Sequence, residues 1–352
     1  MFEELLRTWT GEELVVRSDE PTGAWFFVGV HSTVLGPAMG GTRLNTYGAP
    51  EDGVRDVVRL SEAMTLKQAA ANLPYGGGKA VLAVPEVPPP GSDARHTILR
   101  RYADLVDSLG GTYVTAADMN TGQADMDVVG ERTRFVLGRS RERGGSGDPA
   151  PGTALGVFHG IVASVRRTFG SPVLEERTVL VQGVGAVGGE LIQLLHEAGA
   201  TLLVSDVHGA RAHDAAQAVG ATVIEPDLVI GTPCDVFAPC ASGPVLKEDT
   251  IPRLRCRVVA GAANNQLASG EDAERLQEAD ILYAPDFVIN AGGVIHLAGF
   301  ERFGWDEAQV TARITGIGAT LERVFDDAER DGGTTLAAAE ALAAERLAAG
   351  PA

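Results

Sequence analysis

The sequence predicts a two-domain α/β protein, in which an N-terminal α/β domain precedes a doubly wound domain with a parallel sheet. Its 352 residues are about twice the length of a typical domain, enough for two separate cores. In the second half, short apolar runs alternate regularly with helical patterns, which is typical of a parallel sheet covered by helices on both faces. A glycine-rich turn directly follows the first of these runs, where such folds bind ligands.

The expected strands are short apolar runs bounded by turn residues. Those in the first half are Trp25–Val30, Ala80–Val84 and Thr112–Ala116, and those in the second half are Thr178–Gln182, Thr201–Ser205, Ala221–Ile224, Asp235–Ala238, Arg257–Ala260 and Ile281–Ala284. Two helical patterns, Asp306–Asp327 and Thr334–Ala348, follow the last strand, and the second is expected to pack as an apolar cover.

The boundary between the domains is predicted near residue 150. The segment Arg139–Gly152 is polar and rich in Gly, Pro and Ser, as in an interdomain hinge, although an ordinary long loop would have the same composition. We therefore expect one domain over residues 1–149 and another over residues 150–324. Helices from about 325 to 352 are expected to return to the first domain.

Charge and cysteine content limit the classes of partner. Acidic residues outnumber basic ones by 47 to 29, giving a net charge of −18, which disfavours binding to nucleic acid and to anionic membranes. The three cysteines lack CxxC spacing, so neither a disulfide framework nor a structural metal site is expected. The N-terminus is acidic and no apolar run approaches a membrane span, so we expect a cytoplasmic protein.

The glycine-rich turn has the pattern of a dinucleotide-binding fingerprint. Gly183-x-Gly185-x-x-Gly188 follows a strand and opens a helix whose N-terminus would face a pyrophosphate. The next strand ends at Asp206, whose carboxylate would accept hydrogen bonds from a ribose 2′-hydroxyl and repel a 2′-phosphate; Arg211 could soften this preference. The pattern therefore predicts a Rossmann-type domain that binds NAD. The expected coenzyme contacts here are Gly183, Gly185, Ala186, Val187, Gly188 and Asp206.

A lysine in the first half falls on the apolar side of a predicted helix. The helix, Glu51–Ala71, carries an apolar stripe of Val57, Leu60 and Met64, and Lys67 occupies the next step. Lysine is almost never buried unless it is paired or functional, but a lysine at a helix end can also extend to solvent. Lys67 is therefore a candidate ligand for an anionic group.

A second lysine and an aspartate complete the candidate chemistry. Three glycines, Gly76–Gly78, would let a ligand approach the backbone, and Lys79 follows them directly. Asp118 follows a predicted strand, where it is either an active-site acid or only a helix-entry residue. Two lysines in one pocket would disfavour each other's protonation, so that one could act as a base while Lys67 holds a carboxylate. Asp118 could then relay protons.

Five segments, in order along nearly the whole chain, resemble the glutamate/leucine/phenylalanine/valine dehydrogenase family. They are Gly36–Arg43, Leu73–Lys79, Gly183–Gly188, Gly261–Asn265 and Ala284–Gly293. Within this family, the sequence looks most similar to the phenylalanine dehydrogenases of actinobacteria around Met64–Lys67, Asp118–Asp127 and Ile295–Gly299.

The resemblance implies roles for the matching residues. Lys67 would bind the substrate α-carboxylate with the backbone of Gly40 and Gly41, Lys79 would be the general base, and Asp118 would exchange protons with the amino group. Asn264 would contact both substrate and coenzyme, Thr153 would contact the carboxamide, and Asn290 would lie near the nicotinamide. The side-chain pocket would include Met39, Ala116, Val294 and Leu297. The family also implies homo-oligomers, a substrate and oligomerisation role for the first domain, and a cleft between the domains.

The sequence therefore predicts NAD-dependent oxidative deamination of an apolar L-amino acid to its 2-oxo acid and ammonium. Phenylalanine is favoured because of Leu297 and its neighbours, whereas Met39, Ala116 and Val294 look like the leucine and valine enzymes. A branched-chain (leucine or valine) dehydrogenase is therefore the first alternative, and two others stay open. One is a non-catalytic sensor of NAD or an amino acid. The other is a 2-hydroxyacid dehydrogenase, which would usually require a catalytic histidine that the sequence does not clearly offer.

Overall fold

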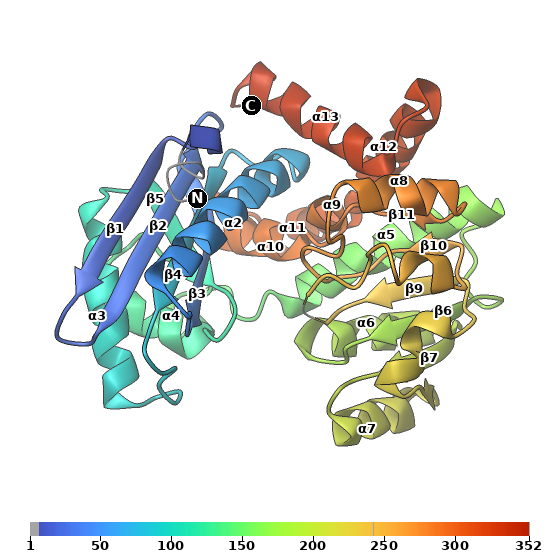
Figure 1. Cartoon of the computed structure of the whole chain (residues 1–352), viewed down its shortest axis with the longest axis horizontal. Coiled ribbons are helices and arrows are strands. Elements are labelled where there is room, and N and C mark those ends of the chain that lie inside the picture. Colours follow the sequence, from blue (N-terminus) through green and yellow to red (C-terminus); the bar gives the residue numbers. More distant parts are fainter. Residues whose placement is uncertain (1–6, 242, 352) are drawn as a thin grey trace. The chain divides into compact units, whose positions relative to one another are not determined.

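The computed structural model describes residues 7–241 and 243–351, which form two compact α/β units (Figure 1). The first unit contains the described residues up to Asp148 together with Leu297–Gly304 and the described residues from Ala343 onward. The second contains Pro149–His296 and Trp305–Leu342. The two-domain α/β fold predicted from the sequence is confirmed. The chain rejoins the first unit at Ala343, whereas it was expected to do so near residue 325. The division into functional domains stays a prediction.

The first unit is built on a mixed five-stranded sheet. Its strands are β1 (Glu13–Asp19), β2 (Ala24–Ser32), β3 (Ala38–Asn45), β4 (Gly76–Ala83) and β5 (Tyr113–Ala117), and its helices include α2 (Pro50–Ala70), α3 (Asp93–Ser108) and α4 (Gln123–Val129). The strand order is β1-β2-β4-β3-β5. β2 is antiparallel to β1 and β4, whereas β3 is parallel to both β4 and β5. The expected strands match β2, β4 and β5, but β1 and β3 were not predicted.

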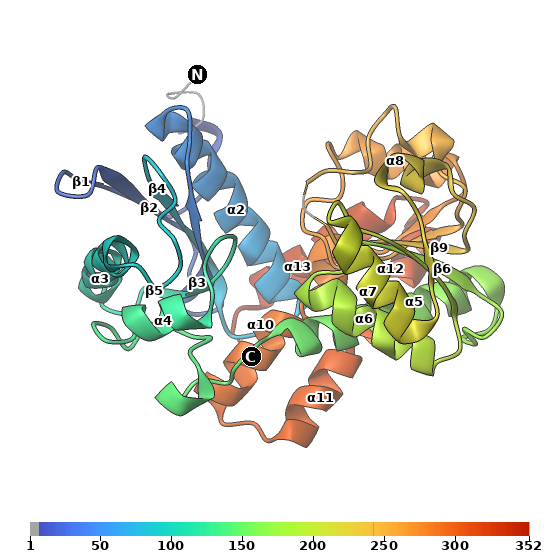
Figure 2. The ribbon, with the colours of Figure 1, turned by 90° about the horizontal axis from the view of Figure 1, so that it is seen from below.

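The two faces of this sheet are covered by different helices. Figure 2 shows α2 and α3 on opposite sides of the strands. Leu82 packs in the core with α3 residues, whereas Val81 packs in a separate core with α2. Because side chains alternate along a strand, Lys79 lies on the same face as Val81, the α2 face. This alternation assigns each candidate residue on β3, β4 and β5 to one face of the sheet.

Helix α2 packs closely on that face through small and polar residues. Pro50 at its first turn and the acidic Glu51 and Asp52 suit a helix N-terminus. A Cβ at Gly77 of β4 would lie 2.1 Å from the backbone nitrogen of Thr65, so only glycine allows this approach. The packed side of α2 thus runs through Val57 and Thr65, and the predicted stripe of Val57, Leu60 and Met64 overlaps it only in part.

The end of the chain completes the first unit. Helix α13 (Thr335–Ala349) places Ala343 in a small core with Leu35 and Ala69. The guanidinium of Arg346 donates hydrogen bonds to the carbonyl oxygens of Ala69 and Ala70, at the C-terminal end of α2. The predicted apolar cover by this last helix is therefore seen on the helix that carries Lys67.

The second unit is a doubly wound parallel sheet. Its strands are β6 (Thr178–Gln182), β7 (Thr201–Ser205), β8 (Thr222–Val223), β9 (Val236–Pro239), β10 (Val258–Val259) and β11 (Leu282–Tyr283), in the order β11-β10-β9-β6-β7-β8. The pairs formed by neighbouring strands are parallel. β6 and β7 match the predicted runs residue for residue, because both carry strong apolar patterns between clear turns.

Helices surround this second sheet. They are α5 (Ala150–Phe169), α6 (Ala186–Glu197), α7 (Gly209–Val219), α8 (Glu271–Glu278), α9 (Asp286–Ile289), α10 (Gly292–Ala298), α11 (Glu307–Thr315) and α12 (Ile317–Asp331). The single helix predicted over Asp306–Asp327 is divided into α11 and α12 at Gly316. The predicted hinge, Arg139–Gly152, contains a 3-10 turn at Arg141–Arg143 and ends inside α5. Among the described residues, no helix is both long and apolar enough to cross a membrane.

Candidate active site

Lys79 and Asp118 form a shielded ion pair in the first unit. Lys79 Nζ lies 3.0 Å from Asp118 Oδ2, and the two side chains are 6% and 21% exposed. Lys79 comes from the middle of β4 and Asp118 directly follows β5, with β3 lying between these two strands. The pair therefore depends on strand order, since its members are 39 positions apart in the sequence.

Two glycines on β3 make room for this pair. A Cβ at Gly41 would lie 2.8 Å from the Cβ of Asp118 and 2.6 Å from the carbonyl oxygen of Ala117. A Cβ at Gly40 would lie 1.7 Å from the carbonyl oxygen of Gly78. Both approaches exclude any side chain at these positions. The glycines predicted to offer their backbone to a substrate thus also allow β3, β4 and Asp118 to pack closely.

Arg43 is part of the same charge cluster, and the sequence analysis assigned it no role. Its Nε donates to Asp118 Oδ2 at 3.2 Å, and its Nη1 donates to Asp56 Oδ2 at 2.7 Å. Asp56 also accepts a hydrogen bond from the hydroxyl of Tyr47 at 2.8 Å. Alternation along β3 puts Arg43 on the same face as Gly41. That signal was available in the motif Gly36–Arg43, but the strand itself was not predicted.

The charges around Asp118 keep it ionised. Burial alone would raise the pKa of its carboxyl group, but the positive charges of Lys79 and then Arg43, with a hydrogen bond from Lys79, lower the pKa from 3.8 to about 2. At neutral pH, Asp118 is therefore a carboxylate that accepts hydrogen bonds from two cationic side chains. A buried carboxylate touching an amine is suited to hold and exchange protons.

Lys67 lies on the helix that packs against the strand of Lys79. Thr65, two residues before Lys67, contacts Gly77, which is two residues before Lys79. The Lys67 side chain is half-buried. The predicted mutual effect of the two lysines stays a prediction, because the ion pair that defines the surroundings of Lys79 is the one with Asp118.

Two of the predicted apolar pocket residues, Met39 and Ala116, share this face of the sheet. Met39 on β3 and Ala116 on β5 are 1% and 4% exposed, and alternation places both on the α2 face with Lys79. Leu297 also belongs to the first unit and is buried, and a Cβ at Gly138 would lie 3.5 Å from its Cδ2. Val294, the fourth predicted pocket residue, belongs to the second unit.

The glycine-rich turn of the second unit has the geometry that a pyrophosphate requires. Gly183 has φ +92°, a value that favours glycine, and a Cβ at Gly188 would lie 1.9 Å from the carbonyl oxygen of Gly183. A Cβ at Gly185 would meet no atom within 4 Å. Gly185 and Ala186 are exposed, and Val187 is half-buried, at the N-terminus of α6. This N-terminus could donate N–H groups to an anion, so these residues fit a dinucleotide.

Asp206 is bound to the glycine-rich turn itself. Its carboxylate accepts hydrogen bonds from the N–H of Val184 at 3.0 Å and the N–H of His208 at 2.9 Å, and Arg211 lies 3.6 Å away. Burial would raise its pKa, but these N–H groups and the guanidinium lower it. Two carboxylate oxygens can accept about four hydrogen bonds, so the predicted contact with a ribose remains compatible with this arrangement.

The other predicted coenzyme contacts form two local groups in the second unit. Asn290 Nδ2 donates to Asn264 Oδ1 at 2.8 Å and to the carbonyl oxygen of Ala262 at 3.1 Å. Thr153 Oγ1 donates to the carbonyl oxygen of Pro149, and a Cβ at Gly293 would lie 2.6 Å from that hydroxyl. The hydrogen bond between the two asparagines thus joins two of the family motifs, Gly261–Asn265 and Ala284–Gly293.

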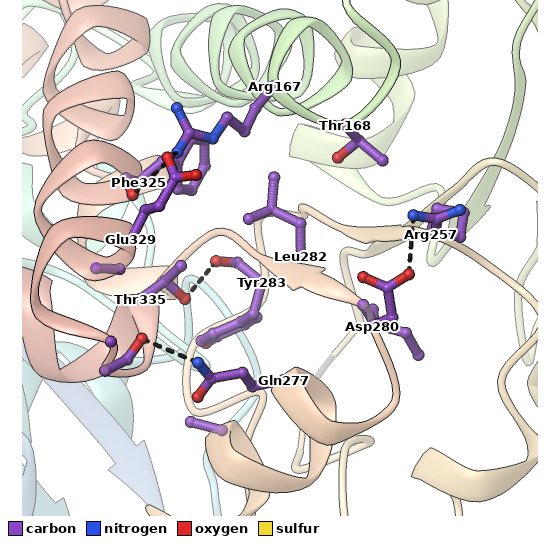
Figure 3. A pocket seen from close by; sticks show the side chains of 15 residues that line it. Arg167, Thr168, Arg257, Gln277, Asp280, Leu282, Tyr283, Phe325, Glu329 and Thr335 are labelled. Carbon is purple, nitrogen blue, oxygen red and sulfur yellow. Dashed lines mark hydrogen bonds and ion pairs between the residues drawn. The ribbon is translucent and has the colours of Figure 1, made fainter.

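A separate cavity of about 430 Å³ lies beside the edge strand β11 (Figure 3). Its charged side chains are paired: Arg257 with Asp280 at 3.0 Å, and Arg167 with Glu329. The predicted site residues do not line it. It is therefore distinct from the lysine–aspartate pair and from the glycine-rich turn.

A dinucleotide turn on a doubly wound sheet, together with a second domain that holds a buried lysine–aspartate pair, defines a two-domain dehydrogenase. In particular, the chain belongs to the glutamate/leucine/phenylalanine/valine dehydrogenase family and is an amino acid dehydrogenase. The family's dimerisation domain matches residues 22–135, and the glutamate/leucine/phenylalanine/valine dehydrogenase domain matches residues 144–216 and 211–350. The predicted coenzyme, NAD, is that of this family.

Individual relatives are similar over nearly the whole chain. A leucine dehydrogenase from Thermoactinomyces intermedius is 42% identical over 96% of this chain and 90% of its own length. A valine dehydrogenase from Streptomyces virginiae is 42% identical over 96% of this chain and 93% of its own length. The crystal structure of L-tryptophan dehydrogenase from Nostoc punctiforme has a TM-score of 0.82 and 39% identity, covering 99% of this chain and 98% of that chain.

These relatives correct one expectation. The sequence favoured phenylalanine because of Leu297 and its neighbours, but the three relatives described above are named for leucine, valine and tryptophan. The branched-chain alternative is supported better. The physical reason is that replacing one pocket side chain changes the pocket by only a methylene or two. A change of that size discriminates too weakly between substrates for one residue to determine which amino acid is preferred.

Proposed function

We propose that this enzyme catalyses the reversible NAD-dependent oxidative deamination of branched-chain L-amino acids, leucine and valine. The observation that carries the proposal is the ion pair of Lys79 and Asp118 on the same sheet face as the apolar Met39 and Ala116. A proton-exchanging pair beside an apolar surface suits an amino acid whose reacting end is polar and whose side chain is not. The names of the relatives agree with an aliphatic substrate.

The reaction converts an L-amino acid, NAD and water into a 2-oxo acid, ammonium, NADH and a proton. When bound, NAD accepts the hydride that leaves the substrate Cα. Lys67 would hold the α-carboxylate, aided by the backbone at Gly40 and Gly41. Asp118 would exchange protons with the substrate nitrogen, and Lys79 would take the proton from the water that adds to the iminium carbon. The last step requires a neutral Lys79, so the lysine would first give the proton of its ion pair with Asp118 to that carboxylate or to solvent.

Residues in the second unit would orient the coenzyme. We assign the pyrophosphate to the N-terminus of α6 at Gly185, Ala186 and Val187, and the ribose to Asp206. Thr153, Asn264 and Asn290 would lie near the nicotinamide. The hydrogen bond that Asn290 Nδ2 donates to Asn264 Oδ1 orients both amides, which supports an orienting role.

The side-chain pocket of the first unit would be formed by Met39, Ala116 and Leu297. These groups are apolar, so they offer no partner for an acidic side chain such as that of glutamate. Aromatic amino acids are a second candidate, because one similar solved structure is an L-tryptophan dehydrogenase and Ala116 leaves more room than a larger residue would. We also propose a homo-oligomer assembled through the first domain, because its family model describes a dimerisation domain.

A single assay tests the proposal. NADH formation is measured with L-leucine, L-valine, L-phenylalanine, L-tryptophan and L-glutamate, each with NAD and with NADP. We expect leucine or valine with NAD to give the highest kcat/KM. A higher value for an aromatic amino acid would replace the proposed substrate, and no turnover of any amino acid would reject the catalytic assignment.

A further inference from the structure

A short π-helical segment, η4 (Gly299–Phe303), joins several parts of the first unit. Such wide helical turns are uncommon and occur frequently at functional sites. Glu301 lies within η4, and its Oε1 accepts hydrogen bonds from the N–H of Gly138 at 3.0 Å and from the N–H and Oγ of Ser146 at 3.0 and 2.5 Å. One carboxylate oxygen thus holds both ends of the loop between Gly138 and Ser146.

The same loop contacts a residue of the proposed pocket. Leu297, one helical turn before Glu301, packs where a Cβ of Gly138 would lie, 3.5 Å from its Cδ2. Gly138 has φ +75°, so a glycine is favoured there as well. The hydrogen bond from Gly138 to Glu301 therefore fixes the surface against which Leu297 rests. Moving the loop would change the space around that leucine.

Two other residues of η4, Arg302 and Phe303, contact the segment that directly precedes Lys79. The ring of Phe303 lies 5.9 Å from the ring of Tyr75, measured between centroids, and Arg302 hydrogen-bonds with the Tyr75 side chain. Tyr75 directly precedes the three glycines and Lys79 of β4. Arg302 also donates to the carbonyl oxygen of Arg134 at 3.3 Å. η4 is therefore attached both to the loop behind Leu297 and to the strand of the catalytic lysine.

We propose that Glu301 is a positioning residue that determines side-chain specificity, because it fixes the Gly138–Ser146 loop behind Leu297. This inference rests on the proposed function, since it concerns the same pocket. Hydrogen bonds to a charged acceptor are about twice as strong as neutral ones, so three donors on one carboxylate give a stiff attachment. A stiff wall discriminates between substrates that differ in width, whereas a mobile wall adapts to both.

Two variants at Glu301 and one control test the inference. Glu301→Ala removes the acceptor, and Glu301→Gln keeps an oxygen but removes the charge. Glu142→Ala is the matched control, because Glu142 is an exposed acid in the same loop, within the 3-10 turn Arg141–Arg143. The readout is the ratio of kcat/KM for L-leucine to that for L-phenylalanine.

We expect Glu301→Ala to change this ratio by about tenfold, the effect of one or two methylenes of pocket space. Glu301→Gln should change this ratio less than Glu301→Ala does, and Glu142→Ala should leave it unchanged. If Glu301→Ala lowers both values by the same factor, Glu301 is only a structural brace and the proposal is wrong.

Amide hydrogen exchange separates this inference from the proposed function. We expect the N–H groups of Gly138 and Ser146 to exchange faster in Glu301→Ala than in the wild type or in Glu142→Ala, whether or not the enzyme turns over. Unchanged exchange would reject the attachment itself. If exchange accelerates but the wild type forms NADH from none of the amino acids, the proposed function is wrong, and so is the specificity role of Glu301. The attachment of the Gly138–Ser146 loop to Glu301 would still be supported.

Discussion

Two aspartates, one in each unit, follow strands of a parallel pair but are held in different ways. Asp118 accepts hydrogen bonds from the side chains of Lys79 and Arg43, which come from other strands. Asp206 accepts them from the backbone N–H groups of Val184 and His208, close to it in the sheet. Lys79 can exchange a proton with Asp118, whereas the Arg43 guanidinium keeps its charge. Asp206 is held by backbone amides, with the Arg211 guanidinium 3.6 Å away, and none of these groups releases a proton near neutral pH, which suits a binding role.

The largest effect is expected at the cationic partner of Asp118. Lys79→Ala removes the proposed base, so we expect kcat to fall by about 10²- to 10⁴-fold, the usual contribution of general acid–base catalysis. NADH binding, measured by its fluorescence, should persist because the glycine-rich turn lies in the other unit. Substantial residual deamination by the variant would show that another group removes the proton.

The second lysine should affect binding more than chemistry. Lys67→Ala removes a charged partner of the substrate carboxylate, so we expect KM for the amino acid to rise by about 10- to 100-fold. Lys247→Ala is a matched control, because Lys247 is the third of the chain's three lysines and pairs with Asp249 in the second unit. An unchanged KM in Lys67→Ala would contradict the proposed carboxylate contact.

Asp118 should also make the stability of the protein depend on pH in the acid range. The pKa of Asp118 falls from 3.8 to about 2 in the folded chain. A lowered pKa in the folded state stabilises the protein by about 2 kcal/mol above pH 4, and this contribution is lost as the pH falls toward 2. Denaturant unfolding at pH values between 5 and 2.5 measures this loss.

Asp118→Asn provides the comparison for that measurement. The variant should be less stable at neutral pH, because Lys79 and Arg43 lose their shared counter-charge, and its stability should depend less on pH over the acid range. An acid dependence equal to that of the wild type would mean that other carboxyl groups cause it.

The smallest effect is expected at Asp206. Asp206→Ala removes the proposed ribose contact and the repulsion of a 2′-phosphate, so the ratio of kcat/KM with NAD to that with NADP should fall by about tenfold. Part of this effect would come from loosening the glycine-rich turn. Titrations with NADH and with NADPH separate the two causes. A loosened turn weakens the binding of both coenzymes, whereas loss of the ribose contact weakens the binding of NADH more.

The same comparison explains what could be predicted from the sequence. The dinucleotide turn and Asp206 lie within one strand–helix–strand unit, so their spacing along the chain determines their spacing in space. The group around Asp118 depends instead on the order β4-β3-β5, which spacing alone does not reveal. Lys79 and Asp118 were candidates because one follows three glycines and the other follows a predicted strand, and the family resemblance added their roles. Arg43 was missed because the glycine-rich β3 does not look like a strand. Glu301 was missed for a similar reason, since its partners lie more than 150 positions earlier.

The hydrogen bonds from Arg346 to the end of α2 have a consequence for biosynthesis. The helix that carries Lys67 is completed by residues near the end of the chain, and the first unit also includes Leu297–Gly304. The five strands of the first sheet are all synthesised before Asp118, whereas Arg346 is added only after the whole of the second unit. We therefore expect the first sheet to be complete early, and the C-terminal end of α2 to gain its contacts with Arg346 only after the second unit has been synthesised.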